Sequence, residues 1–340
     1  FKKNKPDIVI NAAGRVGGIL DNLKFIDEYI FINIMIGFNL LNCANKYGVK
    51  RFINLGSACI YPREVKQPIK ESYLLSSKLE KTNEGYALAK ISTLKYCEYL
   101  NQKYNKNFTS LQPANLYGEG DNFDLQSSHV IPALIRKFHI AKANSKKTVE
   151  VWGSGNVKRE FLNVDDLASS VIFLLNKKIN YPYINVGSRD YLSIKDLSKI
   201  IKKITKYKGK IVFNKKYPDG VKERKLDTSI LDKLGWKSKI KIQSGLEKYY
   251  NYFVKHYTWF KMSFPFFSIV TPVFNGERYI EETIKSVISQ STNDYEYIIV
   301  DNLSTDNTPN IIKKYSSKIN KIITEKDNGM YDAIEKGFSH

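Results

Sequence analysis

The feature that most constrains the fold is an alternation between short apolar segments and longer segments with helical periodicity. Residues 7–13, 51–56 and 108–112 are rich in β-branched and aromatic residues and end at or next to glycine or proline, as buried parallel strands do. Residues 31–47 and 84–104 lie between them and repeat apolar residues at helical spacing. This alternation predicts an α/β fold with a doubly wound, Rossmann-type parallel sheet.

The chain divides into three regions. Short strand-like segments at 149–152 and 183–186 mix with helices beyond residue 117, which favours a smaller α+β substrate domain over the carboxyl edge of the sheet. A new α/β pattern begins near residue 268. We therefore expect a first domain over 1–256 (the sheet mainly 1–117, the smaller part mainly 118–256), a linker over 257–266 and a second α/β segment over 267–340.

The charge of the chain indicates which kind of ligand it binds, and its cysteine content indicates its cellular compartment. Lys and Arg number 54 against 34 Asp and Glu, a net charge of +20, which attracts anions. Only eight of the 54 are Arg and the lysines are scattered, so a phosphorylated small molecule is favoured over nucleic acid. Cys43, Cys59 and Cys97 form no C-x-x-C pair, which argues against a disulfide framework or zinc site and for the cytoplasm. No apolar run reaches membrane-spanning length.

Tyr86 and Lys90 are the first candidate catalytic pair. They are four residues apart in a predicted helix and so share one face. A nearby ammonium favours the phenolate and is expected to lower the pKa of Tyr86, which would let it exchange a proton with a carbonyl or alcohol. Ser57 follows a predicted strand, where ligands bind in such sheets, and could donate to the same carbonyl. Taken singly, the pair is better explained as a solvated Lys beside a core Tyr.

Cys59 and His129 are a second candidate pair. A thiolate two residues from Ser57 could remove a proton from carbon next to a ketone, and an imidazole could return one. Each residue alone is more often structural, Cys59 as a small buried apolar residue and His129 as a hydrogen-bonded core histidine.

Five motifs together carry a specific resemblance. They are Gly-Ser-x-Cys-Ile-Tyr-Pro, Asn-Glu-x-Tyr-Ala-x-Ala-Lys, Asn-Leu-Tyr-Gly, Ser-His-Val-Ile-Pro-Ala-Leu and Trp-Gly-Ser-Gly-x-x-x-Arg-Glu-Phe-Leu. From Phe1 to about His256 the chain resembles the extended short-chain dehydrogenase/reductases and, among them, the GDP-L-fucose synthase family. The resemblance implies an NADPH-dependent enzyme that epimerises C3 and C5 of GDP-4-keto-6-deoxy-D-mannose and reduces C4 to give GDP-L-fucose.

The resemblance also implies roles for individual residues. Tyr86 would be the proton donor to the C4 oxygen, Lys90 would hold the nicotinamide ribose, Ser57 would polarise the ketone, and Cys59 and His129 would be the base and acid of epimerisation. The expected NADP(H)-binding residues are Leu55, Gly56, Ser57, Ala58, Lys90, Pro113, Ala114, Asn115, Leu116 and His129. The expected substrate-binding residues are Lys137, Trp152, Arg159 and Asp227. The family commonly forms homodimers, so a homodimer is expected here.

One departure from the family concerns the dinucleotide. The glycine-rich phosphate-binding fingerprint is absent, because Gly14-Arg15-Val16-Gly17-Gly18 lacks the G-x-G-x-x-G spacing, and we expect the fingerprint upstream of Phe1. The alternatives are therefore another NAD(P)-dependent sugar-nucleotide epimerase, or a fragment that does not bind the cofactor. A dehydratase would want an acidic residue at positions 58 and 59, which hold Ala and Cys.

The last segment resembles the beginning of a family 2 (GT-A) glycosyltransferase. Two predicted strands end near Val273 and Asp301, and Thr271, Pro272 and Asp301 match nucleotide-contacting positions of that family. We expect its metal-binding Asp-x-Asp and its catalytic base beyond His340, and hence an inactive, partial segment without a metal. Met262 stands where an independent transferase would begin, so either two neighbouring genes are joined in a truncated record or the protein is bifunctional.

Overall fold

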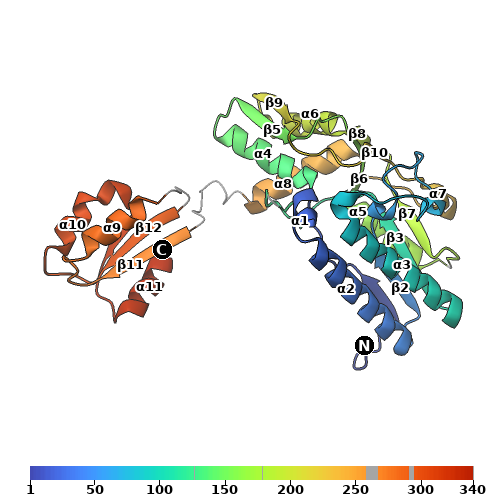
Figure 1. Ribbon diagram of the computed structural model, residues 1–340, viewed down its shortest axis with the longest axis horizontal. Helices are drawn as coiled ribbons and strands as arrows, with labels where there is room; N and C mark the ends of the chain where they lie inside the picture. Colours follow the sequence, from blue (N-terminus) through green and yellow to red (C-terminus); the bar gives the residue numbers. More distant parts are fainter. Residues whose placement is uncertain (126, 178, 258–266, 291–294, 340) are drawn as a thin grey trace. The chain divides into compact units, whose positions relative to one another are not determined.

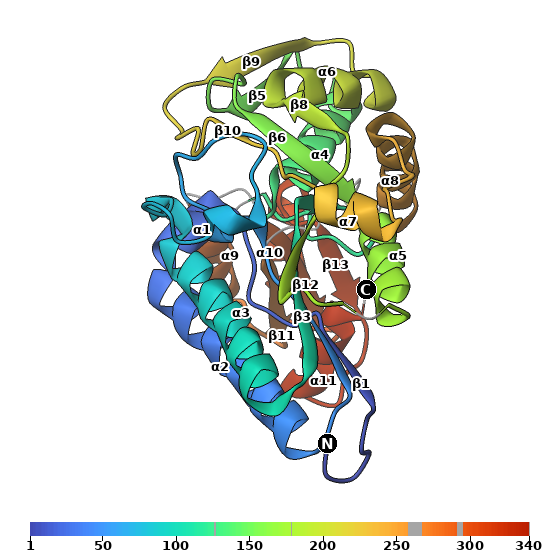
Figure 2. The ribbon, with the colours of Figure 1, turned by 90° about the vertical axis from the view of Figure 1, so that its right-hand side faces the viewer.

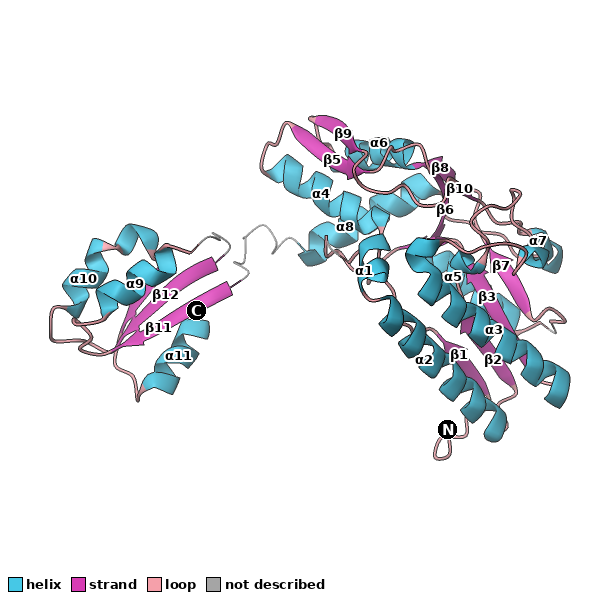
Figure 3. Cartoon of the chain, in the orientation of Figure 1, coloured by secondary structure: helices cyan, strands magenta, loops and turns pink. Residues whose placement is uncertain are grey.

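The computed structural model describes residues 1–125, 127–177, 179–257, 267–290 and 295–339. The chain separates into two compact units, the first being Phe1–Tyr257 and the second having Phe267 as its first described residue (Figure 1). Apart from Tyr257, the predicted linker lies outside the described residues. The helices and strands of each unit are coloured by type in Figure 3.

A parallel sheet of four strands organises the first unit, and the predicted α/β fold is confirmed. The strand order is β1-β2-β3-β7, and each neighbouring pair is parallel. The strands are β1 (Ile8–Asn11), β2 (Arg51–Leu55), β3 (Asn107–Pro113) and β7 (Tyr183–Val186). The strand at 183–186, which the sequence predicted within the smaller domain, thus joins the main sheet, because its buried apolar side chains pack beside β3.

Helices cover both faces of this sheet (Figure 2). On one face, Phe52 and Phe108 pack against α2 (Ile26–Lys46) and α3 (Glu84–Tyr104). Ile53 belongs to a second core cluster with side chains of α5 (Val164–Leu175), because successive residues of a strand point to opposite faces. The two helices on the first face approach closely, since a Cβ on Gly37 would lie 2.3 Å from the Thr93 hydroxyl oxygen.

The smaller part of the first unit has its own sheets and core. Strand β6 (Lys158–Asn163) pairs with β4 (Asn115–Tyr117), β8 (Tyr191–Ser193) and β10 (Glu223–Arg224), and β5 (Thr148–Trp152) pairs with β9 (Lys210–Asn214). The helices α4 (Val130–Ala143), α6 (Ile194–Thr205) and α8 (Ile242–Tyr257) enclose an apolar cluster that includes Phe138. The remaining helices of the first unit are α1 (Ile19–Lys24) and α7 (Ser229–Leu234), with short 3₁₀ turns at Ala58–Ile60, Glu71–Tyr73 and Lys81–Asn83.

The second unit is a parallel sheet of three strands with helices packed against it. The strands are β11 (Phe267–Val273), β12 (Tyr295–Asp301) and β13 (Lys321–Thr324), in that order. The helices are α9 (Ile280–Ile288), α10 (Thr308–Lys314) and α11 (Met330–Phe338), with a 3₁₀ turn at Ser316–Lys318. Its core centres on Ile284, Tyr297 and Ile299.

Among the described residues of both units, no helix combines the length and the apolar character needed to cross a lipid bilayer.

Candidate active site

Ser57 and Cys59 occupy one tight turn at the carboxyl end of β2. Gly56 and Ser57 follow the strand directly, and the 3₁₀ turn Ala58–Ile60 begins after Ser57. The Ser57 hydroxyl oxygen accepts a hydrogen bond from the Cys59 backbone nitrogen at 3.1 Å, which caps this turn. The hydroxyl and the thiol are therefore held on the same short segment, as the sequence predicted from their position after the strand.

Tyr86 and Lys90 reach this turn from the first two turns of α3. The Lys90 nitrogen lies 5.6 Å from the centre of the Tyr86 ring and donates a hydrogen bond to the Leu55 carbonyl oxygen at 3.0 Å. The Tyr86 side chain hydrogen-bonds Ser57 and experiences the charge of Cys59. The predicted quartet of Ser57, Cys59, Tyr86 and Lys90 is thus brought together.

The predicted effect of Lys90 on the pKa of Tyr86 is wrong for this arrangement. Burial is the largest influence and raises the pKa of Tyr86 above its usual value, Cys59 raises it further, and the hydrogen bond with Ser57 opposes both. Burial also disfavours the ammonium and lowers the pKa of Lys90 to about 8, an effect that Cys59 opposes. Desolvation outweighs the attraction between the two groups here.

His129 stands at the beginning of α4, where it is the residue before the first helical one. Burial lowers the pKa of its imidazole, and the charge of Asp121 acts in the opposite direction. Asp121 is the charged group that acts on His129. The segment before His129 is held by a backbone hydrogen bond from the Gly18 nitrogen to the Ser127 carbonyl oxygen at 2.9 Å.

The expected cofactor-binding residues form a strip along the carboxyl edge of the sheet. The ends of β2 and β3 are joined by a hydrogen bond from the Gly56 nitrogen to the Leu111 carbonyl oxygen at 2.7 Å. After β3, the Ala114 nitrogen donates to the Val186 carbonyl oxygen at 2.9 Å, and the Asn115 side chain turns to β6 and donates to the Glu160 carbonyl oxygen at 3.0 Å. The strip comprises Leu55, Gly56, Ser57, Ala58, Pro113, Ala114, Asn115 and Leu116.

This edge fits the ribose end of a nicotinamide dinucleotide. An ammonium has three donors, and the Lys90 nitrogen gives one of them to Leu55. Gly14 approaches the same nitrogen so closely that an added Cβ would lie 3.4 Å from it. Lys90 therefore has further donors that can bind ribose hydroxyl groups. Gly14 beside it has no side chain that would occupy the space for the ribose.

Two guanidinium groups converge on the catalytic turn from the smaller part of the unit. Arg159 on β6 experiences the charges of both Arg224 and Cys59. Burial lowers the pKa of Arg159 to about 10, the neighbouring Arg224 lowers it further, and Cys59 opposes them. Arg224 on β10 is buried, donates to the Ala58 carbonyl oxygen at 2.7 Å, and has its other terminal nitrogen buried without a hydrogen-bond partner among the described residues. Such a pair of cations is suited to an anion.

The sequence placed substrate contacts within residues 219–227 and named Asp227, but it did not single out Arg224. The Asp227 carboxylate instead accepts a hydrogen bond from the Ser229 nitrogen at 2.9 Å, next to the start of α7. The signal that could have found Arg224 is its residue type, since it is one of only eight arginines and arginine suits buried anion sites better than lysine.

The remaining predicted substrate residues lie together at the end of β5. The Lys137 nitrogen is 4.4 Å from the centre of the Trp152 ring and donates to the Glu150 carbonyl oxygen at 3.3 Å. Burial lowers the pKa of Lys137. The Trp152 ring is stacked on Tyr217 at 4.3 Å, a partner that the sequence did not indicate.

In the second unit, polar side chains gather where the parallel strands end. Asp301, the last residue of β12, is buried and accepts a hydrogen bond from the Ser304 nitrogen at 3.2 Å. Thr271 donates to the Tyr297 hydroxyl at 3.2 Å, and Pro272 pairs with Val300 in the sheet.

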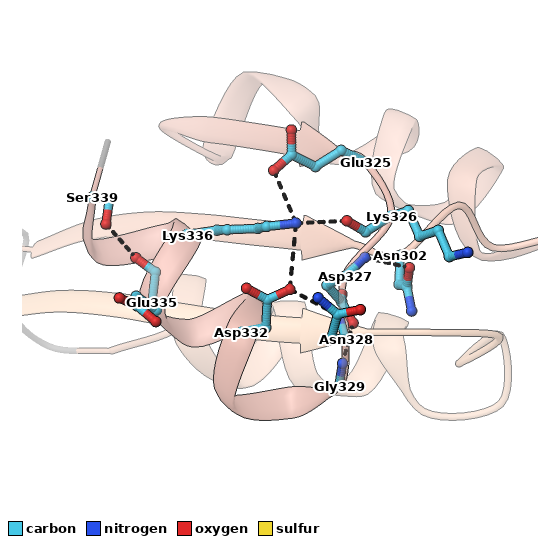
Figure 4. Close-up of polar contacts among 10 residues, drawn as sticks. All are labelled: Asn302, Glu325, Lys326, Asp327, Asn328, Gly329, Asp332, Glu335, Lys336 and Ser339. Carbon is cyan, nitrogen blue, oxygen red and sulfur yellow. Dashed lines mark hydrogen bonds and ion pairs between the residues drawn. The ribbon is translucent and has the colours of Figure 1, made fainter.

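A loop after β13 completes that edge (Figure 4). Its Asp327 nitrogen donates to the Asn302 side chain at 2.8 Å. Lys336 on α11 holds the loop through the Lys326 carbonyl oxygen and ion pairs with Glu325 and Asp332 at 3.3 and 3.6 Å.

Comparison with known proteins assigns both units. Residues 1–187 match the NAD dependent epimerase/dehydratase family. The chain belongs to this family. It is 42% identical to the GDP-L-fucose synthase of Escherichia coli (strain K12), in an alignment that covers 75% of this chain and 83% of that protein. It is 41% identical to GDP-L-fucose synthase 1 of Arabidopsis thaliana, over 75% of this chain and 79% of the relative.

Solved structures agree with this assignment. A GDP-L-fucose synthetase from Naegleria fowleri bound to NADP superposes with a TM-score of 0.70 at 27% identity, covering 76% of this chain and 80% of that one. A GDP-mannoheptose C4 reductase from Campylobacter jejuni with NADP bound has a TM-score of 0.68 at 34% identity, covering 74% and 83%. Residues 268–340 match the Glycosyl transferase family 2 model, as the sequence predicted.

Proposed function

We propose that the first unit is a GDP-L-fucose synthase, an NADPH-dependent enzyme that epimerises C3 and C5 of GDP-4-keto-6-deoxy-D-mannose and reduces C4. The observation that carries this proposal is the turn at the end of β2, which holds Ser57 and Cys59 together beneath Tyr86 and Lys90. It places a hydroxyl, a thiol and a phenol in one site, as a reaction centred on a single ketone requires.

Epimerisation is assigned to Cys59 and His129. C3 and C5 both flank the C4 ketone, so removal of a proton from either carbon gives an enolate at the same oxygen. The Cys59 thiolate takes that proton, the protonated His129 gives one to the opposite face, and the hydroxyl groups of Ser57 and Tyr86 stabilise the oxygen charge. Burial lowers the pKa of His129 and the charge of Asp121 opposes this effect, so the imidazole must take up a proton before it can give one to the sugar.

Reduction is assigned to Tyr86 with Lys90. NADPH supplies the hydride that reaches C4. Tyr86 gives its proton to the C4 oxygen, while Ser57 holds that oxygen by a hydrogen bond. Lys90 lies beside Tyr86 and donates to the Leu55 carbonyl oxygen, and its remaining donors are assigned to the ribose.

Binding of the substrate diphosphate is assigned to Arg159 and Arg224. Arg224 is buried and Arg159, its partner across β6 and β10, is partly buried, and two neighbouring guanidinium groups are stabilised by an anion between them. Lys137 on α4 and Trp152 at the end of β5 lie side by side. We propose that they contact the nucleotide part of the substrate.

The test is turnover of the purified protein. We expect NADPH oxidation on addition of GDP-4-keto-6-deoxy-D-mannose, with GDP-L-fucose as the product identified by NMR. Ser57→Ala and Tyr86→Phe variants should retain the fold but lose at least a hundredfold in kcat, because each removes a donor to the reacting oxygen. Formation of a 4-reduced sugar without inversion at C3 and C5 would contradict the epimerase part of the proposal.

A homodimer is proposed through the outer face of α2. Phe31, Met35 and Phe38 follow one another at helical spacing and are 66%, 43% and 37% exposed, which is unusual for large apolar side chains that lie along one helix. A second copy can cover this stripe in a two-fold interface. Light scattering should show a dimer that Met35→Lys dissociates, and a monomeric wild type would contradict the interface.

For the second unit we propose binding of a nucleoside diphosphate at the carboxyl edge of β11 and β12, with Thr271, Pro272 and Asp301 as the contacting residues. Isothermal titration with UDP and GDP tests this, and Asp301→Asn should abolish any heat of binding. The cytoplasm is the proposed location, because the three cysteines are free and Cys59 must stay reduced to act as a base.

A further inference from the structure

A row of buried polar side chains crosses three strands of the main sheet. It consists of Asn11, Asn54, Ser110 and Gln112, all at most 4% exposed, and is called the polar ladder below. Asn11 pairs with Asn54 across β1 and β2, and Asn54 pairs with Ser110 across β2 and β3. Strands buried on both faces are normally apolar throughout, so four polar residues on one face need a reason.

Each member of the polar ladder is hydrogen-bonded to the next. Asn11 donates to the Asn54 side-chain oxygen at 2.9 Å, and Asn54 donates to the Ser110 hydroxyl oxygen at 2.9 Å. Gln112 donates to the same hydroxyl oxygen at 3.0 Å. The row is therefore continuous from β1 to Gln112, near the carboxyl end of β3.

Each end of the polar ladder accepts a hydrogen bond from a backbone nitrogen near the candidate catalytic residues. At one end the Gln112 side-chain oxygen accepts a hydrogen bond from the Ser57 nitrogen at 2.9 Å. At the other end the Asn11 side-chain oxygen accepts from the Ala13 nitrogen at 3.1 Å, one residue before Gly14 and its close approach to Lys90.

Gly56 is what lets Gln112 reach Ser57. A Cβ at this position would lie only 2.2 Å from the Gln112 side-chain oxygen, so any other residue would displace the amide. The hydrogen bond between Ser57 and Gln112 thus depends on the glycine at position 56 as well as on the polar ladder.

We propose that the polar ladder positions the catalytic turn, with Gln112 fixing Ser57 and the row behind it fixing Gln112. The catalytic part of this inference rests on the proposed function. A buried amide has few ways to satisfy its donors and acceptors, so a continuous row of hydrogen bonds favours one arrangement of side chains. Ser57 then presents its hydroxyl to Tyr86 and to the Cys59 nitrogen at a fixed place. Gln112 is a positioning residue, because it acts through Ser57.

Gln112→Met tests the inference, since methionine has a similar length and shape but cannot accept from Ser57. The matched control is Asn101→Leu, which removes the paired hydrogen bonds between Asn101 and Phe108 (2.7 and 2.9 Å) at the opposite end of β3. Both variants lose hydrogen bonds that involve a residue of β3. Hydrogen exchange of the backbone amides of residues 54–60 and steady-state kinetics are measured for each.

We expect Gln112→Met to speed exchange of the Ser57 amide at least tenfold and to lower kcat for both epimerisation and reduction at least fivefold. The KM values for NADPH and the sugar nucleotide should stay within twofold, and Asn101→Leu should leave exchange at Ser57 and kcat unchanged. Asn11→Leu should also speed exchange at Ser57, because Asn54 loses its donor.

Unchanged exchange at Ser57 in Gln112→Met would overturn the positioning role, whatever the activity. Faster exchange with an unchanged kcat would overturn its catalytic part. The exchange experiment needs no substrate, so a wild-type protein that fails to turn over the keto sugar defeats the proposed function and leaves the exchange result to decide the structural claim.

Discussion

The Arg224 guanidinium donates a hydrogen bond to the Ala58 carbonyl oxygen at 2.7 Å, and this contact joins the smaller part of the first unit to the catalytic turn. Ala58 lies between Ser57 and Cys59. The same arginine that is proposed to bind diphosphate thus also touches the backbone that carries both reactive side chains. The proposed diphosphate site and the catalytic turn therefore share this side chain.

Arg224→Met should therefore affect both KM and kcat. Loss of a charge-assisted hydrogen bond costs about 1.5–3 kcal/mol, which corresponds to an increase of roughly 10- to 150-fold in KM for the sugar nucleotide. The kcat should fall as well, because the Ala58 carbonyl loses its donor. Steady-state kinetics measure both, and Arg278→Met in the second unit is the control that should change neither. A normal KM in Arg224→Met would remove this residue from the substrate site.

Activity should fall as the pH rises through about 8. Burial lowers the pKa of Lys90 to about 8, so above that pH the side chain becomes neutral and loses its charge and one donor. The pH profile of kcat/KM for reduction, which reports groups in the free enzyme, should show this fall above about pH 8. The Lys90→Met variant should have a much lower rate, and its kcat/KM should not fall near pH 8.

Stability should change in the opposite direction over the same range. The unfolded chain keeps Lys90 protonated up to its ordinary value of 10.5, whereas the folded chain releases the proton near 8. The unfolded state therefore binds more protons between these values, and the contribution of Lys90 to stability rises with pH. Thermal unfolding measured beside the kinetics separates the two effects, and a midpoint that falls together with the activity would assign the fall in kcat/KM to unfolding.

Cys59→Ser should separate the two halves of the reaction. A hydroxyl is a far weaker base than a thiolate, so exchange of the C3 and C5 hydrogens with deuterated water should fall at least a hundredfold. Direct reduction of the keto sugar should continue, because Ser57, Tyr86 and Lys90 are unchanged. Mass spectrometry of the product measures the exchange. Normal incorporation of deuterium at both carbons would show that Cys59 is not the base.

Much of the fold could be predicted because it depends on local patterns. The helix α3 begins at Glu84 and ends at Tyr104, as its apolar spacing predicted, and the strands β1, β2 and β3 follow the apolar runs within a few residues. The strand β7 was misplaced, because its partner β3 lies about 70 positions earlier in the sequence. No local pattern in a strand of four residues indicates which sheet it joins.

The catalytic turn could also be predicted because it depends on a local pattern. The residues that hold it in place could not, because they come from distant parts of the sequence. Ser57 and Cys59 lie next to each other after a predicted strand, whereas Arg224 approaches Ala58 from 166 residues away. Asn54 and Gln112 did leave a signal, since each is a polar residue at an alternate position of an apolar strand. That pattern is also typical of a half-exposed strand, and only burial distinguishes the two.

Glu160 gives a further prediction, which concerns stability. Its two carboxylate oxygens accept hydrogen bonds from the Ser188 nitrogen at 2.7 Å and the Leu226 nitrogen at 2.8 Å. The side chain is almost wholly buried, and this burial raises its pKa to about 7 in spite of both bonds. The folded protein therefore binds a proton there between pH 4.5 and 7 that the unfolded chain has released. The contribution of Glu160 to stability is full below pH 4.5 and falls as the pH rises towards 7.

Glu160→Gln should remove this dependence. Each unit of pKa difference is worth about 1.4 kcal/mol, so the free energy of unfolding of the wild type should fall relative to the variant by something of the order of 3 kcal/mol between pH 4.5 and 7. The variant loses one acceptor, since its amide nitrogen must face a backbone donor, and should be the less stable protein at pH 4.5. Urea unfolding at several pH values measures the difference between the two proteins. A difference that stays constant with pH would mean that Glu160 is ionised throughout this range, and that its two backbone donors compensate fully for burial of the charge.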